Sequence, residues 1–285
     1  MIVVVGSNGQ LGSELVKAAE RLTLACTPLT HADVDIECTA SVDGVLGSCW
    51  QPSGPMTVIN TAAFHNVDAC ERDAQLAFEV NAIGSLNVAS WCREHQAKYV
   101  YVSSEFVDAT PTDPSGYPLS VYAKTKMAGE LAALSLCPDG LVVRLGGLYG
   151  VAGCSGKPGR GNFIDTVVAK IKSGEKFTLP DYTKCFFTSA RHAATRILQN
   201  LDKSGVWYAT DGVRMSHYQI GCRLCEMLGL PNHIMAVSHD PDDNIRPRES
   251  NLGEQNFQYR LDTFSIDSVV PPLYEYLVEK GHIGG

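Results

Sequence analysis

The stretch Val3–Gly12, VVVGSNGQLG, decides the fold class of this 285-residue chain. β-Branched residues lead into it, helix-forming residues follow it, and Gly6, Gly9 and Gly12 occupy the turn between them. Small residues in the first strand–helix turn let backbone N–H groups approach a pyrophosphate at the helix N-terminus. The stretch therefore predicts the start of a dinucleotide-binding domain.

Short apolar runs alternate with helical patterns from this turn to Gly150. We expect strands at 1–5, 23–29, 56–63, 98–104 and 140–150, and helices at 10–22, 73–95 and 120–135. Nearly continuous apolar strands separated by helices are typical of a parallel sheet covered on both faces. The sequence thus predicts an α/β fold, a Rossmann-type doubly wound parallel sheet with a smaller interleaved C-terminal substrate lobe.

The regular alternation of strands and helices ends after Gly150, where the glycine-rich segment 151–162 predicts a mobile loop. Helices are expected at 163–175, 188–202 and 215–230, followed by a polar, irregular stretch at 240–256. We divide the chain into an NAD(P)-binding domain, 1–150, and a lobe, 151–285, that mainly binds substrate. A segment at about 185–215 is expected to return to the first domain.

Composition excludes several classes of function. The net charge of −8 gives no general basic field for nucleic acid or an anionic membrane surface. Apolar runs stay well short of the roughly 20 residues of a membrane span, and the first strand has no charged leader, so we expect a cytoplasmic protein. The ten cysteines form no framework and are expected to be reduced, with Cys222 and Cys225 packed in a helix. No spacing of histidine, cysteine or acidic residues indicates a metal site.

Tyr122 and Lys126 form a Tyr-x-x-x-Lys pattern in SVYAKTKMAGE, 120–130. Spaced four apart, the two residues share a helix face, although the pattern alone is common. Ser104 ends the preceding strand, where ligands of this fold class bind. Together the three predict a hydride-transfer site: Ser104 polarises a carbonyl, Tyr122 protonates its oxygen, and Lys126 holds the nicotinamide ribose and lowers the proton affinity of Tyr122.

The ribose side of the cofactor site is less specific. The second strand ends near Thr30 without a carboxylate, and Asp33 and Asp35 follow, Asp35 being as compatible with a turn cap as with a ligand. This favours NADP(H) slightly and leaves NAD(H) open. The expected cofactor-binding residues, besides Tyr122 and Lys126, are Gly6, Asn8, Gly9, Gln10, Leu11, Gly12, Thr30, Asp35, Ile36, Asn60, Ala62, Ala63, Asn81, Val102 and Ser103.

Several motifs together resemble the extended short-chain dehydrogenase/reductase superfamily, and most closely its dTDP-4-dehydrorhamnose reductase family. They are GSNGQLG, INTAAFHNVDACE, AFEVNAIGSLNVA, VSSEFV, PLSVYAKTKMAGE and VVRLGGLYG, with RPRESNL late in the chain. The resemblance implies reduction of the C4 ketone of dTDP-6-deoxy-L-lyxo-4-hexulose with NAD(P)H. It also implies that Ser104, where the family usually has Thr, acts with Tyr122 and Lys126.

The chain departs from the family on the substrate side. Glu105 stands where the family usually has Asp, Phe64 and Phe106 replace tyrosines, and Gly147 replaces a tryptophan. The expected substrate-binding residues are Phe64, Val67, Asp68, Ser104, Glu105, Phe106, Gly147, Asn162 and Arg246, and candidate phosphate partners are Lys157, Arg160, Arg246 and Arg248. The sugar and the oligomeric state stay open, and a homodimer is compatible with the sequence.

Two alternatives accompany the reductase. The same superfamily contains nucleotide-sugar epimerases and dehydratases, which keep the cofactor bound and show no net oxidation. The family also contains non-catalytic regulatory homologues, such as the methionine adenosyltransferase β subunit. The Ser104, Tyr122 and Lys126 set favours the reductase over the regulatory alternative.

Overall fold

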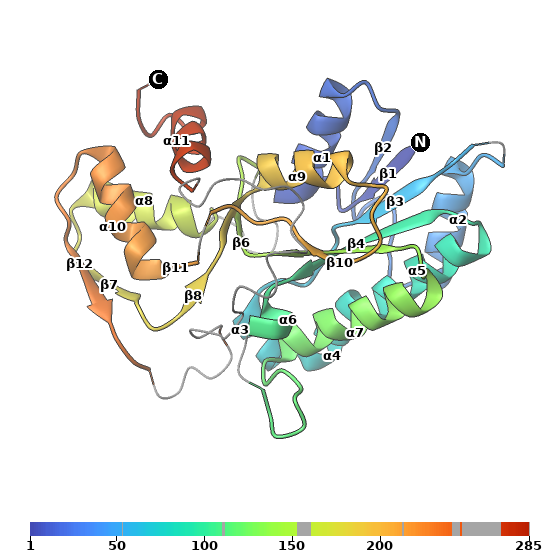
Figure 1. The fold of residues 1–285 in the computed structure, drawn as a ribbon, viewed down its shortest axis with the longest axis horizontal. Coiled ribbons are helices and arrows are strands. Elements are labelled where there is room, and N and C mark those ends of the chain that lie inside the picture. The colour runs from blue at the N-terminus through green and yellow to red at the C-terminus, as the bar shows by residue number, and fades with distance from the viewer. Residues whose placement is uncertain are drawn as a thin grey trace.

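A computed structural model of the chain describes residues 1–52, 54–109, 112–152, 161–212, 214–240, 246 and 269–284. The first 150 residues alternate strands and helices as expected (Figure 1). Their elements are β1 (Ile2–Val5), α1 (Gln10–Arg21), β2 (Cys26–Leu29), α2 (Thr39–Cys49), β3 (Thr57–Asn60), α3 (Val67–Arg72), α4 (Ala74–Phe78), the π-helical turn η1 (Glu79–Ile83), α5 (Gly84–Glu94), β4 (Lys98–Ser104), α6 (Phe106–Ala109), α7 (Val121–Leu136), β5 (Leu141–Leu145) and β6 (Gly147–Tyr149).

The elements after Gly150 are shorter and less regular in their order. They are α8 (Phe163–Ser173), β7 (Phe177–Pro180), β8 (Lys184–Cys185), β9 (Phe187–Ser189), α9 (Ala190–Gln199), β10 (Gly205–Tyr208), β11 (Met215–Ser216), α10 (His217–Leu228), β12 (Ile234–Val237) and α11 (Val270–Glu279). The glycine-rich residues 153–160 and most of the polar stretch 240–256 lie outside the described residues.

A six-stranded sheet in the order β10-β5-β4-β3-β1-β2 forms the centre of the first domain, and all its pairings are parallel. β1 pairs with β2 on one side and with β3 on the other, so Val5 lies between Leu29 and Asn60. The strand order therefore reverses at β1. In open α/β sheets this reversal opens a crevice beyond the carboxyl ends of the strands, where ligands bind.

Both faces of the sheet are covered, because successive strand residues point to opposite faces. Ile2 and Val4 pack in one core with α1 and α9, whereas Val3 and Val5 pack in another with α2, α5 and α7. Figure 1 shows these helix layers on either side of the strands. The predicted doubly wound α/β class is confirmed.

The second half builds a lobe at one end of the sheet (Figure 1). Its core joins α8, α10 and α11 with the short parallel pair β7 and β12. Ile164, Val168, Ile220 and Leu224 are fully or almost fully buried in it. By contrast, α9 packs against α1 and β10 joins the large sheet, so the chain between 190 and 208 lies with the first domain.

Two expected elements are interrupted. The helix expected at 73–95 is divided by η1, and the extra residue of the π turn rotates α5 relative to α4. The strand expected at 140–150 is divided at Gly146, where a Cβ atom would lie 2.3 Å from the carbonyl oxygen of Phe186. β6 thereby leaves the large sheet and pairs with β9 of the lobe.

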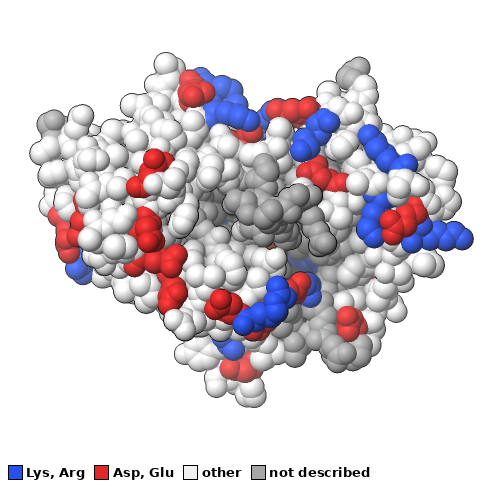
Figure 2. All heavy atoms as spheres, turned by 180° about the vertical axis from the view of Figure 1, so that it is seen from behind, with Lys and Arg blue, Asp and Glu red and all other residues white. Residues whose placement is uncertain are grey.

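The charges on the described surface are mixed. On the face drawn in Figure 2, Lys and Arg side chains mostly neighbour Asp and Glu side chains, with no broad basic field among the described residues. None of the helices in the described part of the chain combines the length and apolar character that a membrane crossing needs.

Candidate active site

The turn between β1 and α1 admits only glycine at two of its positions. Gly6 has a φ of +81°, and a Cβ atom there would lie 2.7 Å from Thr61 Oγ1. A Cβ atom on Gly12 would lie 2.2 Å from the carbonyl oxygen of Gly6. The turn is therefore closed onto both α1 and the end of β3, and Thr61 locks it by donating to the carbonyl oxygen of Val5 at 2.8 Å.

The N-terminus of α1 opens at this turn. Gly9 is its N-cap residue and offers no side-chain cap, and the first turn carries no acidic residue. Asn8 is exposed, Gln10 is half-buried and Leu11 is buried. Uncapped N–H groups and the positive end of the helix dipole attract an anion. The residues of the turn thus fit a dinucleotide pyrophosphate.

The turn after β2 presents the carboxylate of Asp33, which is not among the expected cofactor-binding residues. Thr30 donates to Asp33 Oδ2 from its backbone nitrogen at 2.7 Å and from its hydroxyl at 2.6 Å. These bonds lower the pKa of Asp33 below its usual value. Asp35 instead caps a turn by accepting from the Glu37 nitrogen at 3.0 Å, and Ile36 is buried. The turn-cap interpretation of Asp35 therefore describes this structure.

Two buried asparagines shape the segment after β3. Asn60 accepts from the Ala62 nitrogen at 3.0 Å and donates to Tyr99. Asn81 accepts from the Phe64 nitrogen at 2.9 Å and donates to the Phe64 carbonyl at 3.0 Å. Each is 1% exposed, so its amide is used within the protein and fixes the backbone of 62–64 beside the crevice.

Ser104 and Tyr122 meet at the carboxyl end of β4. The ring of Phe106 packs edge-on against Tyr122 with 5.6 Å between centroids, and Ser104 Oγ accepts from the Phe106 nitrogen at 3.2 Å. Burial raises the pKa of Tyr122 to about 12, while the neighbouring Ser104 hydroxyl lowers it and Cys70 raises it further. Tyr122 is therefore a protonated donor at neutral pH.

Lys126 lies one turn further along α7 and is 1% exposed. Its ammonium donates to the Val102 carbonyl at 2.8 Å and lies 4.2 Å from the centre of the Tyr101 ring. Burial lowers the pKa of Lys126 to about 7, against the opposing effect of Glu130. The expectation that Lys126 lowers the proton affinity of Tyr122 stays a prediction, and burial is the largest influence on the Tyr122 pKa, which it raises.

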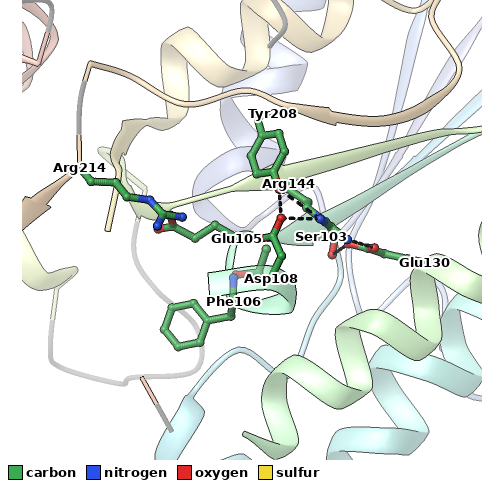
Figure 3. Close-up of polar contacts among 9 residues, drawn as sticks. Ser103, Glu105, Phe106, Asp108, Glu130, Arg144, Tyr208 and Arg214 are labelled. Atoms are coloured by element: carbon green, nitrogen blue, oxygen red, sulfur yellow. Dashed lines mark hydrogen bonds and ion pairs between the residues drawn. The ribbon is translucent and has the colours of Figure 1, made fainter. Parts of the chain in front are cut away.

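A charged network begins at Ser103, the residue before Ser104 on β4, and we call it the network behind Ser104. Figure 3 shows its members Glu130, Arg144, Asp108 and Tyr208. Ser103, expected to contact the cofactor, donates its hydroxyl to Glu130 at 2.5 Å. Arg144 binds both oxygens of Glu130, at 2.8 and 2.7 Å, and Asp108 at 2.8 Å. Tyr208 donates to Asp108 and accepts from Arg144. The side chain of Ser103 is thus directed into the protein.

Glu105, the residue after Ser104, is fully buried and joins the sheet to the lobe. It accepts from the Phe186 nitrogen and from Arg214, each at 3.1 Å, and Figure 3 shows Arg214 reaching it from the lobe. Burial raises the pKa of Glu105 to about 8, against the effect of Arg214. In this structure Glu105 bridges the two parts of the chain and offers no surface to a substrate.

The remaining expected substrate residues are dispersed. Asn162 is buried and caps α8 by accepting from the Asp165 nitrogen at 3.1 Å. Arg246 and Asp68 were expected to contact substrate separately, yet they pair with each other at 2.5 Å. Gly147 has room for a Cβ atom, whose nearest neighbour would be 3.4 Å away.

For the other expected cofactor and substrate residues, the structure gives only the degree of burial. Phe64 and Val67 are half-buried beside the crevice, as are Ala62 and Ala63. Lys157, Arg160 and Arg248 lie outside the described residues.

Four members of the network behind Ser104 are absent from the residues predicted from the sequence, namely Asp108, Glu130, Arg144 and Tyr208. One signal was available, since Arg144 is a lone charge within the apolar strand LVVRL. A buried charge requires a partner. The partners come from α6, α7 and β10, which no local pattern could bring together.

Among the described residues, no group of three or more His, Cys, Asp or Glu side chains is placed to hold a metal ion. Cys222 and Cys225 are free thiols on α10, Cys225 being buried. His217 and His192 contact neighbouring side chains, Thr183 at 3.3 Å and Asp211 at 3.7 Å respectively.

Comparisons with known proteins agree with this geometry. Residues 1–267 match the family model described as RmlD substrate binding domain. A curated relative, the dTDP-4-keto-6-deoxy-D-glucose reductase of Streptomyces niveus, is 29% identical over 272 residues, covering 88% of each chain. A dTDP-4-dehydrorhamnose reductase of Clostridium acetobutylicum superposes with a TM-score of 0.81 at 25% identity, covering 98% of this chain and 99% of its own. The dTDP-4-dehydrorhamnose reductase of Bacillus anthracis, solved in complex with NADP, superposes with a TM-score of 0.79 at 23% identity, covering 98% of this chain and 97% of its own.

Proposed function

Because this chain belongs to the family described as RmlD substrate binding domain, we propose that it is an NAD(P)H-dependent reductase of a nucleotide-linked 4-keto-6-deoxysugar, similar to dTDP-4-dehydrorhamnose reductase. The observation that carries the proposal is the neighbouring pair Ser104 and Tyr122, with Lys126 one turn away, at the carboxyl edge of a sheet that begins with a closed glycine turn. The resemblance inferred from the motifs and the family match point to the same enzyme class.

The pyrophosphate would lie on the turn Gly6–Gly12, with the backbone of 62–64 beside it. NAD(P)H supplies the hydride that reduces the ketone. Ser104 donates a hydrogen bond to the substrate carbonyl oxygen, and Tyr122 transfers its proton to that oxygen. Lys126 binds the ribose hydroxyls and contributes positive charge beside the developing alkoxide. The high pKa of Tyr122 keeps this proton donor loaded at neutral pH.

The cofactor preference at the ribose is proposed to be relaxed. Thr30 favours a 2′-phosphate because it adds a hydroxyl without a charge of its own. Asp33, ionised at the end of β2, instead favours the free 2′-hydroxyl of NADH. These two groups act in opposite directions, so we propose use of both NADPH and NADH.

The decisive test supplies enzymatically made dTDP-4-keto-6-deoxy-L-hexose with NADPH and with NADH, and follows loss of the nicotinamide absorbance. Rapid loss with formation of the 4-hydroxy sugar is expected. The ratio of the two rates measures the cofactor preference. Absence of loss with this and other nucleotide-linked ketosugars, despite measurable cofactor binding, would contradict the proposal.

An epimerase or dehydratase of the same superfamily is the enzymatic alternative. Such an enzyme returns the hydride to the sugar, so cofactor would survive gel filtration with the purified protein and would not be consumed. The reductase is expected to lose its cofactor on gel filtration.

A regulatory homologue is the non-enzymatic alternative, motivated by Phe64, Phe106 and Gly147 on the substrate side. It would copurify stably with another enzyme and consume no NAD(P)H. The neighbouring hydroxyl groups of Ser104 and Tyr122 and the nearby Lys126 argue for the reductase, since a regulatory subunit has no need of them.

We also propose an oligomeric state and a cellular location for the enzyme. Phe78, Ile83, Leu86 and Leu131 are 39–62% exposed on neighbouring helices α4, η1, α5 and α7. A second copy packed on these residues would bury their apolar surface, so we propose a homodimer. We further propose that the enzyme acts in the cytoplasm, where nucleotide sugars and reduced nicotinamide cofactors are available.

A further inference from the structure

The network behind Ser104 includes an acidic residue on the same helix face as the proposed catalytic residues. Tyr122, Lys126 and Glu130 follow one another at intervals of four along α7. The side chain of Glu130 is 6% exposed, so its charge is held inside the protein. It contacts Ser103 and Arg144, and the mechanism proposed above leaves it without a role.

Glu130 and Lys126 attach α7 to consecutive residues of β4. Glu130 accepts from Ser103 at 2.5 Å, and Lys126 donates to the Val102 carbonyl at 2.8 Å. Ser104 is the residue after Ser103 on β4, and Tyr122 lies one turn before Lys126 on α7. The two attachments therefore fix the distance between the hydroxyl groups of Ser104 and Tyr122.

The charges around Glu130 leave a negative excess. Arg144 binds Glu130 through two nitrogens and Asp108 through a third, so one guanidinium serves two carboxylates. When both carboxylates are ionised the cluster carries a net charge of −1. Tyr208 donates to Asp108 and adds no charge at neutral pH.

We propose that Glu130 is a positioning residue that holds the ammonium of Lys126 in its charged form and fixes Ser104 against Tyr122. This inference rests on the proposed reductase function. Its chemical basis is that the buried ammonium, next to the Tyr101 ring, has few groups that favour its charge, and Glu130 supplies a carboxylate from the next turn.

The groups that face Lys126 support this assignment. Cys70 approaches from α3 and Tyr101 from β4, whereas Tyr122 lies on the same helix. Burial lowers the pKa of Lys126 to about 7, and Glu130 is the strongest influence that raises it, ahead of the Cys70 thiol. Because the ammonium is required, kcat/KM for reduction should fall as the pH rises through the Lys126 pKa, and loss of Glu130 should move that fall to lower pH.

The first test is independent of turnover. NMR titration of isotopically labelled lysine, with Lys126 assigned from the Lys126→Arg spectrum, measures its protonation directly in the full chain. Glu130→Gln is expected to move the Lys126 midpoint to lower pH by about one pH unit. Glu226→Gln removes a carboxylate from the surface pair with Arg223 and is expected to leave the midpoint in place. An unmoved midpoint in Glu130→Gln would overturn the proposal, whether or not the wild-type enzyme reduces the chosen sugar.

The second test separates charge from position. In Glu130→Gln the alkaline fall of kcat/KM should shift with the Lys126 midpoint, and Glu130→Asp should restore it. Ser103→Ala keeps both charges but removes the attachment to β4, so kcat should fall about tenfold without a shift of the pH profile. Unchanged kcat in Ser103→Ala would refute the positioning role. If Glu130→Gln alone fails to fold, Arg144→Gln keeps the Glu130 carboxylate and removes its paired guanidinium, so the Lys126 midpoint is expected to move to higher pH, and an unmoved midpoint would overturn the proposal.

Discussion

At the scale of single residues, the proposed chemistry depends on a proton donor that stays protonated. Tyr122 packs against Phe106 and lies beside the Ser104 hydroxyl, and its pKa of about 12 lies far above neutral pH. Ser104 is correspondingly placed where a substrate carbonyl would need a donor. A Tyr-x-x-x-Lys pattern alone is common and shows only that two residues share a helix face. The Ser104 hydroxyl beside Tyr122 is what indicates a catalytic site.

Tyr122→Phe is expected to lower kcat about 100-fold or more while leaving the dissociation constant of NADPH within about threefold. The reason is that the substitution removes the proton donor and keeps the ring that packs on Phe106. Steady-state reduction and fluorescence titration of NADPH measure the two effects.

The matched control is Tyr117→Phe, which removes a hydroxyl from a side chain that is 57% exposed. It should leave both quantities unchanged. Full turnover by Tyr122→Phe on the true substrate would rule out the mechanism.

At the scale of elements, the β1–α1 turn shows how close packing and ligand binding coincide. Gly12 lies in the first turn of α1 and touches the carbonyl of Gly6, so the helix axis passes directly behind the turn. The N-terminus of α1 at this turn has no side-chain cap. A side chain at Gly12 would have to move the helix away from the sheet.

Gly12→Ala is therefore expected to lower the free energy of unfolding by about 3 kcal/mol and to weaken NADPH binding. Gly44→Ala provides the comparison, because Gly44 lies within α2 with no atom within 4 Å of its added Cβ. That substitution should stabilise the protein by about 0.5–1 kcal/mol. Urea denaturation of both variants gives the two signs, and equal effects would contradict the packing argument.

At the scale of the whole molecule, Glu105 connects the central sheet to the lobe. Its carboxylate is wholly buried and bonds the lobe at Phe186 and Arg214. It follows Ser104 without an intervening residue, so the lobe is attached next to the proposed catalytic hydroxyl. The attachment uses a carboxyl group whose folded pKa, about 8, exceeds its ordinary value of 4.5.

This pKa difference predicts a pH-dependent stability. Between pH 4.5 and about 8 the folded protein keeps a proton on Glu105 that the unfolded chain has lost, so stability falls as the pH rises through this window. Glu105→Gln removes this pH dependence. The free energy of unfolding of the variant minus that of the wild type should therefore increase by about 1–3 kcal/mol from the lower to the upper end of the window. Thermal unfolding across the window measures it.

Glu175→Gln, at a surface pair with Lys170, serves as the control and should track the wild type at every pH. Parallel curves for wild type and Glu105→Gln would show that the Glu105 carboxyl titrates in the folded protein as it does in the unfolded chain.

The sequence alone determined the class of the fold, the strands and the three long helical segments of the first domain, because the apolar periodicity of strands and helices and the glycine turn are local properties. The helices α2, α3 and α6 were not predicted. The sequence also placed Ser104, Tyr122 and Lys126 in order along the chain. The whole-chain family match, residues 1–267, confirms the resemblance read from its motifs.

Only the tertiary structure decided which buried charges meet. Arg144 finds Glu130 and Asp108 from other elements, Glu105 turns into the lobe, and Arg246 pairs with Asp68 across 178 positions of sequence. Such partners depend on long-range packing and on the cost of leaving a charge unpaired in the interior, neither of which a local pattern records. The same packing, by burying Tyr122 and Lys126, set their protonation in a direction that the sequence could not give.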